Sequence, residues 1–600
     1  MIGVVSYFAI PIISHTIKNM MVRNMSAHRW TYTETQLRNA DIVMAPERLG
    51  AMHQTRLSFV RTLIRKMAQQ EWKVSQHEWD LSDQGFGHVI YKLVTPNHVY
   101  HLVVFCDEID DDDRNDRVIA EKWDVTFALI YGEVNMSLLA KLRANVPLQE
   151  AGRNPNNVMV LARANKSVRV FEQIVSKLST GTQPDPKELA EVGYILRTTA
   201  VYGNGKFGIA DFKMLDSNPD FSQSFSAQMC AVYLLRQFSL DWVDYLAVQR
   251  GGEKSAQLHL ELQRYIGIGN ATGLGMAPYL INHPCIVDQW MTAREKALGL
   301  VLQSKTEKNK LAPLSVLLQK AVCHLGQVIT INEAQKNLNA IAAVELKELN
   351  ASLLALVEKN PSWGALLTQS QHLSYETQEI LLACLMELYP QLVDAFQDQM
   401  NCDETLSLPS GKNIQDLLLI LEKKYKWAIN TDYSLQDNQY WFWYRSEDKE
   451  EPRLGIRGEE PGEERESRLD IGRQANGLYQ ALLHQSPELT LAEFLILQPE
   501  YRTIARRVWT MGNKVMGDIQ MNVLHKKSLP MNLLRCKLSM FGATAFDPRS
   551  DRWVRVTLFQ GAPLLQEIHD QTLRDDWLFP MLPSHHDLLN NAPEIRRKDS

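Results

Sequence analysis

Residues 226–252 read SAQMCAVYLLRQFSLDWVDYLAVQRGG, the clearest helical pattern of the chain. Ser226 can accept hydrogen bonds from the unpaired amides of a first helical turn, and the pair Gly251–Gly252 supplies a left-handed stop. Around this helix, residues 158–400 contain further helical patterns and no stretch rich in β-branched residues. The sequence therefore predicts an α-helical centre.

Strand patterns lie on both sides of this centre. Residues 87–94, 99–105 and 123–131 before it, and residues 553–559 after it, are rich in β-branched and aromatic side chains. We predict an α+β fold, predominantly α-helical, with a helical central domain flanked by two smaller α+β units with antiparallel strands. The predicted parts are a leader or disordered tail at 1–50, an amino-terminal unit at 51–155, the helical domain at 156–405, and a carboxy-terminal unit at 406–600 with a charged loop at 447–468.

The composition excludes several classes of protein. The 600 residues are 45% hydrophobic and 22% charged, as in globular proteins, and the net charge of −6 argues against a general grip on nucleic acid. The seven cysteines have no CxxC spacing, so we predict neither a disulfide framework nor a metal site. The apolar run 2–14 is shorter than the roughly 20 residues of a membrane-spanning helix. We expect a cytoplasmic protein without stable membrane insertion.

Two long helical patterns, at 312–325 and 332–358, resemble an antiparallel hairpin. Such a pair serves either packing within one chain or dimerisation, so a homo-oligomer stays open. The acidic run 107–116 has carboxylates at seven of ten positions but lacks the glycine and terminal glutamate of a calcium loop. A solvated loop is the simpler interpretation.

The densest unusual segment is residues 267–278, GIGNATGLGMAP, which we expect to be a loop between two helices. Its glycines allow close backbone approach, and a following helix would present unpaired amides to an anion. No lysine follows it, so it is not a phosphate loop of the GxxxxGK type. A tight helix crossing is the alternative. The residues expected to bind an anion are Gly269, Asn270, Thr272, Gly273 and Gly275.

A second segment, residues 197–208, reads RTTAVYGNGKFG and is expected at the end of a helix. Arg197 and Asn204 are candidate ligand-binding residues. Lys206 could neutralise a carboxylate or phosphate, and Tyr202 could act as a general acid, so both are candidate catalytic residues. A helix stop followed by a solvated turn would explain the same pattern.

His283 precedes Pro284, which suits the first position of a helix. A histidine there, near the first glycine-rich segment, is a candidate for proton transfer. The alternative is a helix cap or a packed ring.

No zincin, α/β-hydrolase, di-iron or kinase motif is present, so the reaction type and any cofactor are left open. We predict a cytosolic enzyme acting on a small anionic metabolite through a glycine-rich pocket at a helix terminus. The alternative is a non-catalytic ligand-binding or assembly protein whose glycines serve helix packing. The two hypotheses differ in geometry, because only the first requires polar groups of both segments to converge.

Overall fold

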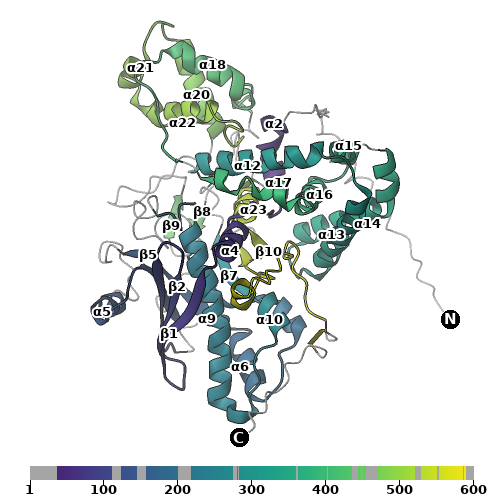
Figure 1. The fold of residues 1–600 in the computed structure, drawn as a ribbon. Helices are drawn as coiled ribbons and strands as arrows, with labels where there is room; N and C mark the ends of the chain where they lie inside the picture. Colours follow the sequence, from purple (N-terminus) through teal and green to yellow (C-terminus); the bar gives the residue numbers. More distant parts are fainter. Residues whose placement is uncertain are drawn as a thin grey trace, which may run out of the picture.

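A computed structural model gives the arrangement of the chain (Figure 1). The residues that it describes are 37–110, 123–144, 157–200, 218–223, 225–273, 280–281, 283–359, 362–401, 403–435, 444–446, 449–453, 471–520, 529–549, 553–584 and 587–588.

A nine-stranded mixed sheet organises the described residues, with strand order β1-β2-β3-β4-β5-β6-β7-β11-β10. Neighbouring strands are antiparallel except β6 and β7, which are parallel. The strands are β1 (Lys73–Leu81), β2 (Gly87–Val94), β3 (Val99–Cys106), β4 (Val125–Tyr131), β5 (Val158–Lys166), β6 (Tyr194–Thr198), β7 (Gly267–Gly273), β10 (Ala543–Pro548) and β11 (Trp553–Leu558). A separate hairpin joins β8 (Tyr444–Ser446) to β9 (Lys449–Arg453).

Three groups of helices accompany the sheet (Figure 1). Those around it are α4 (Phe59–Gln69), α5 (Met136–Ala144), α6 (Phe171–Ser179), α7 (Pro186–Ala190), α9 (Ser226–Gly251), α10 (Leu260–Tyr265), α23 (Leu529–Phe541) and α24 (Leu565–His569). A second group is α2 (Ala40–Val43), α3 (Pro46–Ala51), α12 (Pro284–Gln303), α13 (Lys308–Gln327), α14 (Glu333–Lys359), α15 (Trp363–Gln369), α16 (Tyr375–Glu387) and α17 (Pro390–Asp394). A third is α18 (Ile414–Lys424), α19 (Lys426–Ile429), α20 (Ile471–Leu483), α21 (Leu491–Leu497) and α22 (Arg502–Gly512).

The central strands are buried on both faces, which explains their continuous apolar sequence. One face packs against α9, where Phe127, Leu129 and Ala162 join the main core. On the other face, Ala128 and Leu161 form a smaller core with α5. The two helices therefore cover opposite sides of β4 and β5.

The α+β character of the fold, with a large helical content, is confirmed. The expectation of a wholly helical centre is wrong, because β5, β6 and β7 all lie within residues 156–405. Short apolar runs such as Val158–Ala164 do not distinguish a buried strand from a buried helix by periodicity. The sheet takes strands from all three predicted units, and their boundaries stay a prediction.

The expectation of a leader at 1–50 is wrong for residues 37–50, which include α2 and most of α3. Arg38, two residues before α2, is only 3% exposed. Residues 1–36 lie outside the described part of the chain. Within the predicted charged loop 447–468, residues 449–453 form β9 and the others lie outside the described residues.

The long helix α9 begins and ends near the expected residues, although its cap differs. Ser226 is the first residue of the helix and donates to the carbonyl of Gln223, while Phe225 before it has a left-handed φ of 62°. At the other end Gly252 has φ 55°, as expected of a left-handed stop. The sequence thus located this helix but not its first cap.

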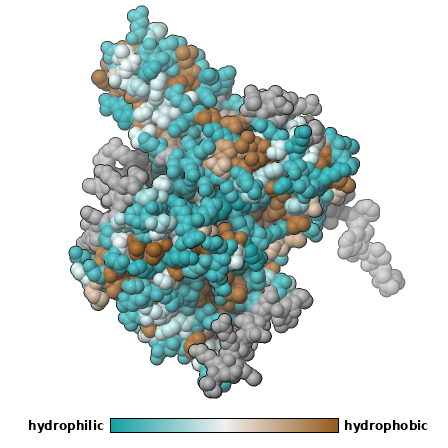
Figure 2. All heavy atoms as spheres, viewed as in Figure 1, coloured by the Kyte–Doolittle hydropathy of each residue, from teal (hydrophilic) through white to brown (hydrophobic). Residues whose placement is uncertain are grey.

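On the face seen in Figure 2, hydrophilic residues predominate and apolar residues lie among them in patches. Among the described helices, none is both long and apolar enough to cross a membrane.

Buried ion pairs join segments far apart in the sequence. In the first group, Arg38 contacts Glu295 at 2.6 Å and Glu379 at 2.7 Å. Arg294 contacts the same two carboxylates at 2.7 and 2.6 Å, and Arg48 lies 3.3 Å from Glu379. We call these five residues the Glu379 cluster. It ties the segment around α2 and α3 to α12 and α16.

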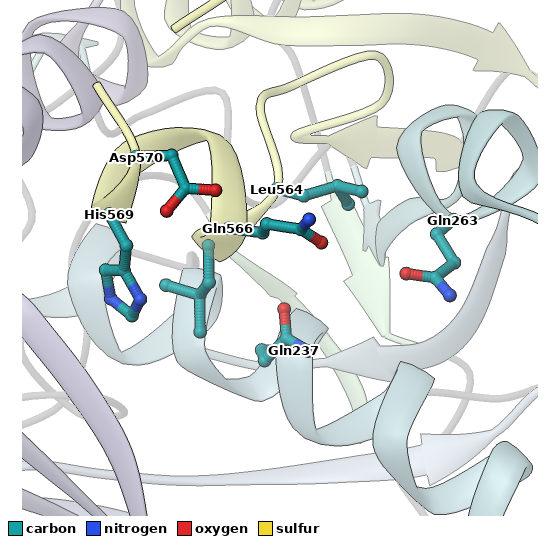
Figure 3. A pocket seen from close by; sticks show the side chains of 7 residues that line it. Gln237, Gln263, Leu564, Gln566, His569 and Asp570 are labelled. Atoms are coloured by element: carbon teal, nitrogen blue, oxygen red, sulfur yellow. The ribbon is translucent and has the colours of Figure 1, made fainter. Parts of the chain in front are cut away.

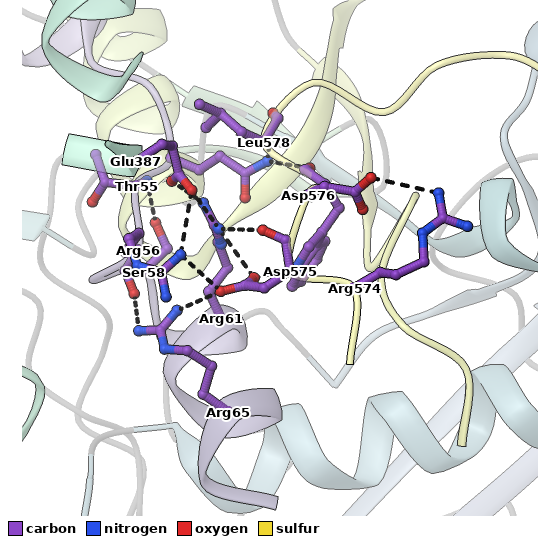
Figure 4. A network of polar contacts seen from close by, with 12 residues as sticks. Thr55, Arg56, Ser58, Arg61, Arg65, Glu387, Arg574, Asp575, Asp576 and Leu578 are labelled. Atoms are coloured by element: carbon purple, nitrogen blue, oxygen red, sulfur yellow. Dashed lines mark hydrogen bonds and ion pairs between the residues drawn. The ribbon is translucent and has the colours of Figure 1, made fainter. Parts of the chain in front are cut away.

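A second group surrounds Asp575 (Figure 4). Arg61 of α4 contacts Asp575 at 3.0 Å and also pairs with Glu387 at the end of α16. Arg56 lies 3.0 Å from Asp575, and Arg65 lies 3.5 Å from it. We call these five residues the Asp575 cluster. It holds the carboxy-terminal segment against α4 and α16.

Candidate functional site

The parallel pair β6 and β7 brings both glycine-rich segments to one edge of the sheet. Arg197 lies opposite Gly269, and the carboxyl ends of the two strands point the same way. The first segment leaves the sheet after Thr198 and the second after Gly273. In open sheets, the carboxyl ends of parallel strands are where ligands commonly bind.

A row of hydrogen-bond donors crosses the sheet beside this edge. Thr126 of β4 lies directly opposite Arg163 of β5, and the Thr199 amide donates to the Arg163 carbonyl at 3.0 Å. Cross-strand neighbours of this kind lie side by side on one face. Trp123 joins the group, because the Arg163 guanidinium lies 5.3 Å from the centre of its ring. We call Trp123, Thr126, Arg163 and Thr199 the donor row.

Each side chain of the donor row has a buried polar atom without a hydrogen-bond partner in the structure. The atoms are Trp123 Nε1, Thr126 Oγ1, Arg163 Nε and Thr199 Oγ1. All four groups can donate a hydrogen bond. Since buried polar groups are normally satisfied, four such donors in one place suggest a binding site.

Arg163 differs in its electrostatics from the paired arginines of the fold. Burial lowers the pKa of its guanidinium to about 10, and no carboxylate among the described residues opposes this effect. The side chain is partly exposed, so a ligand can reach it. A desolvated guanidinium without a counter-charge favours an anion, which it can bind through two parallel N–H groups.

The other polar residues near the donor row are engaged. Asp124 accepts from the Lys166 amide at 2.9 Å, and Asn165 accepts from the Asp124 amide at 3.1 Å. Arg197 lies opposite Asn165 in the register of β5 and β6 and is 8% exposed. Arg197, which was predicted to bind a ligand, therefore lies on the strand next to Arg163, opposite the residue two positions after it.

The expectation that residues 267–278 form a loop between helices is wrong, because residues 267–273 form strand β7 inside the sheet. A Cβ on Gly269 would lie 2.6 Å from ring carbons of Tyr194, and a Cβ on Gly267 would collide with the Leu558 carbonyl. These glycines therefore allow the sheet to pack closely. The side-chain amide of Asn270 donates to the Thr198 carbonyl at 2.9 Å and so links β7 to β6.

The remaining predicted binding residues are only partly placed. Thr272 and Gly273 pair in register with Val554 and Trp553 of β11. Tyr202, Asn204, Lys206 and Gly275 lie outside the described residues. The segment that begins at Arg197 was expected at the end of a helix. It begins inside strand β6 instead, and Gly193, with φ 77°, lies between α7 and this strand.

His283 is the residue before α12, and its side chain accepts no capping hydrogen bond from the first turn of the helix. Its Nδ1 lies 2.6 Å from a carboxylate oxygen of Glu404. Pro284 is the first residue of the helix, as the sequence predicted. The catalytic role of His283 stays a prediction.

Sequence reasoning missed Arg163, the central residue of the donor row. The available signal was a single arginine inside the otherwise apolar run Val158–Ala164. A charge in such a run is costly to bury and therefore suggests a function. That inference needed the run to be identified as a central strand.

Comparisons with protein-family models, with curated proteins and with solved structures find no match to this chain.

Proposed function

We propose that the chain binds a small anionic ligand at the donor row. The observation that carries this proposal is the partly exposed Arg163, which has no carboxylate partner among the described residues and is flanked by three unsatisfied donors. A phosphate or carboxylate group would supply the missing acceptors. Its charge would also offset the burial of the guanidinium.

We further propose that this binding serves an enzyme acting on a small anionic metabolite. The position beside the carboxyl ends of β6 and β7 supports this choice, since such edges hold many ligand sites. We assign no reaction type. The carboxylate beside the donor row, Asp124, accepts a hydrogen bond from the backbone amide of Lys166, which indicates a structural role. One observation favours the alternative of a non-catalytic binding protein: Gly267 and Gly269 have a packing role.

The test is a binding measurement by thermal shift and isothermal titration calorimetry. The probes are inorganic phosphate and a panel of phosphorylated and carboxylated metabolites. Replacing Arg163 with methionine (Arg163→Met) removes the guanidinium and retains the length of the apolar part of the side chain. We expect the affinity to fall about 10- to 150-fold, the equivalent of about 1.5–3 kcal/mol for a hydrogen bond to a charged group.

The matched control is Arg250→Met, which removes the same charge from an exposed arginine that pairs with Glu172 at 2.7 Å. It should leave the affinity unchanged. If Arg163→Met binds every anion as tightly as the unmodified protein, the donor row is not the site. If the unmodified protein binds none of the probes, the proposal fails.

A further inference from the structure

A polar cavity lies between α9, α10 and α24 and has a volume of about 300 Å³ (Figure 3). This volume is at the lower end of the range for small-molecule sites. The cavity shares no residue with the donor row. We call it the glutamine cavity, and it is lined by Gln237, Gln263, Leu564, Leu565, Gln566, His569 and Asp570.

Two glutamines turn acceptor atoms toward this cavity. The Gln237 amide nitrogen donates to Asp241 at 2.8 Å, and that of Gln263 donates to the Leu258 carbonyl at 2.7 Å. Both partners accept only, so the orientation of each amide is fixed and each side-chain oxygen is left for a ligand. Figure 3 shows these two oxygens pointing into the space beneath α24.

The side of the cavity formed by α24 contributes a neutral histidine and a carboxylate. His569 Nε2 accepts from the Val74 amide at 3.2 Å, and burial lowers the pKa of the ring, which favours its neutral form. Asp570 follows with an exposed carboxylate. Neither lysine nor arginine is among the seven lining residues, although Lys73 Nζ lies 3.5 Å from the His569 carbonyl.

A second carboxylate, Asp241, contacts the lining residue Gln237 without lining the cavity itself. Asp241 accepts from Tyr91 at 2.6 Å and from Gln76 at 3.3 Å, in addition to Gln237. These three hydrogen-bond partners are neutral donors, and burial raises the pKa of the Asp241 carboxyl group. A positive charge in the cavity would stabilise the ionised form of Asp241.

We propose that the glutamine cavity binds a small organic cation with several N–H donors, of the aliphatic diamine class. Ammonium groups donate only, which matches two amide oxygens and a carboxylate that accept. Leu564 and Leu565 offer an apolar surface to the methylene groups between them. The cavity therefore has a preference opposite in sign to that of the donor row.

Isothermal titration calorimetry with 1,4-diaminobutane and with 1,4-butanediol tests this proposal, because the two probes share their length and differ in charge. The diamine should bind, and the diol should bind at least about tenfold more weakly, as expected for the loss of charge-assisted hydrogen bonds. Equal binding of the two probes, or no binding of the diamine, would overturn the proposal.

Two variants locate the binding. Asp570→Asn should weaken the diamine about two- to fivefold, a modest loss because this carboxylate is exposed. Gln263→Met should weaken it about two- to tenfold by removing one acceptor. The control Glu253→Gln neutralises an exposed carboxylate outside the cavity and should change nothing. Unchanged affinity in both cavity variants would show that the diamine binds elsewhere.

Discussion

The donor row and the Glu379 cluster both place arginine in the interior, with opposite results. In the cluster, Arg38 and Arg294 each contact two carboxylates, and these contacts hold distant helices together. In the donor row, Arg163 has no carboxylate partner among the described residues and lies beside unsatisfied donors. Buried arginine therefore has its charge matched by carboxylates in the first region, and in the second it has no carboxylate partner among the described residues.

Burial shifts the pKa of charged groups in both regions, but among the described residues nearby opposite charges oppose this effect only in the Glu379 cluster. Burial alone would raise the pKa of Glu379, yet Arg38, Arg294 and Arg48 hold it well below its usual value. In the donor row, burial acts on Arg163 without opposition. Folding must therefore supply the desolvation energy of Arg163 from other contacts.

The largest effect is expected in the Glu379 cluster. Glu379→Ala would leave three buried arginines with Glu295 as the remaining carboxylate of the cluster, and it should lower the free energy of unfolding by about 3–5 kcal/mol. Equilibrium unfolding in urea measures the change. The control Glu172→Gln breaks an exposed pair with Arg250 and should cost under about 1 kcal/mol. Similar losses in both variants would contradict a special role for the buried cluster.

The second prediction concerns pH and the Asp575 cluster. Burial would raise the pKa of Asp575, but Arg61, Arg65 and Arg56 lower it to about 2. A lowered carboxyl pKa contributes stability above the pKa of the unfolded chain, near 3.9, and this contribution is lost as the pH falls toward 2. The loss should be about 2 kcal/mol in the unmodified protein.

Asp575→Asn should remove this part of the acid dependence. At pH 6 the unmodified protein should have its full advantage in unfolding free energy over the variant. Near pH 2 this advantage should be smaller by about 2 kcal/mol. Urea unfolding at a series of pH values measures it. A difference that stays constant with pH would mean that the Asp575 carboxylate is not stabilised by its arginines.

The sequence predicted the parts of the fold that local patterns determine. Strands β2, β3 and β11 and helix α9 lie close to their expected positions, because period and turn residues mark them. The strands β5, β6 and β7 were missed. Their short apolar or glycine-rich sequences become strands only when a neighbouring strand pairs with them, and that pairing is a tertiary effect.

The same limit applies to the candidate site. Arg197 was selected from the sequence, and the structure pairs it with Asn165, two residues after Arg163, which was not selected. The two arginines come close only because β5 and β6 are neighbouring strands, and no local sequence pattern predicts the order of strands in a sheet. The two arginine clusters were also unforeseen, since Arg61 and Asp575, for example, are separated by 514 positions in the sequence.

The smallest effect on stability is expected for Arg163→Met, although the same change should weaken ligand binding. Methionine retains the apolar length of the side chain and removes a charge that burial disfavours. Without ligand, the free energy of unfolding should therefore stay within about 0.5 kcal/mol of the unmodified protein or rise. Arg61→Met is the matched comparison, because it removes a fully buried arginine that contacts both Glu387 and Asp575. It should cost about 3–5 kcal/mol, as expected when one partner of a buried ion pair is removed. Urea unfolding of both variants in phosphate-free buffer measures the contrast. A loss above about 2 kcal/mol for Arg163→Met would show that its guanidinium has a structural role, and the distinction between the two kinds of buried arginine would fail.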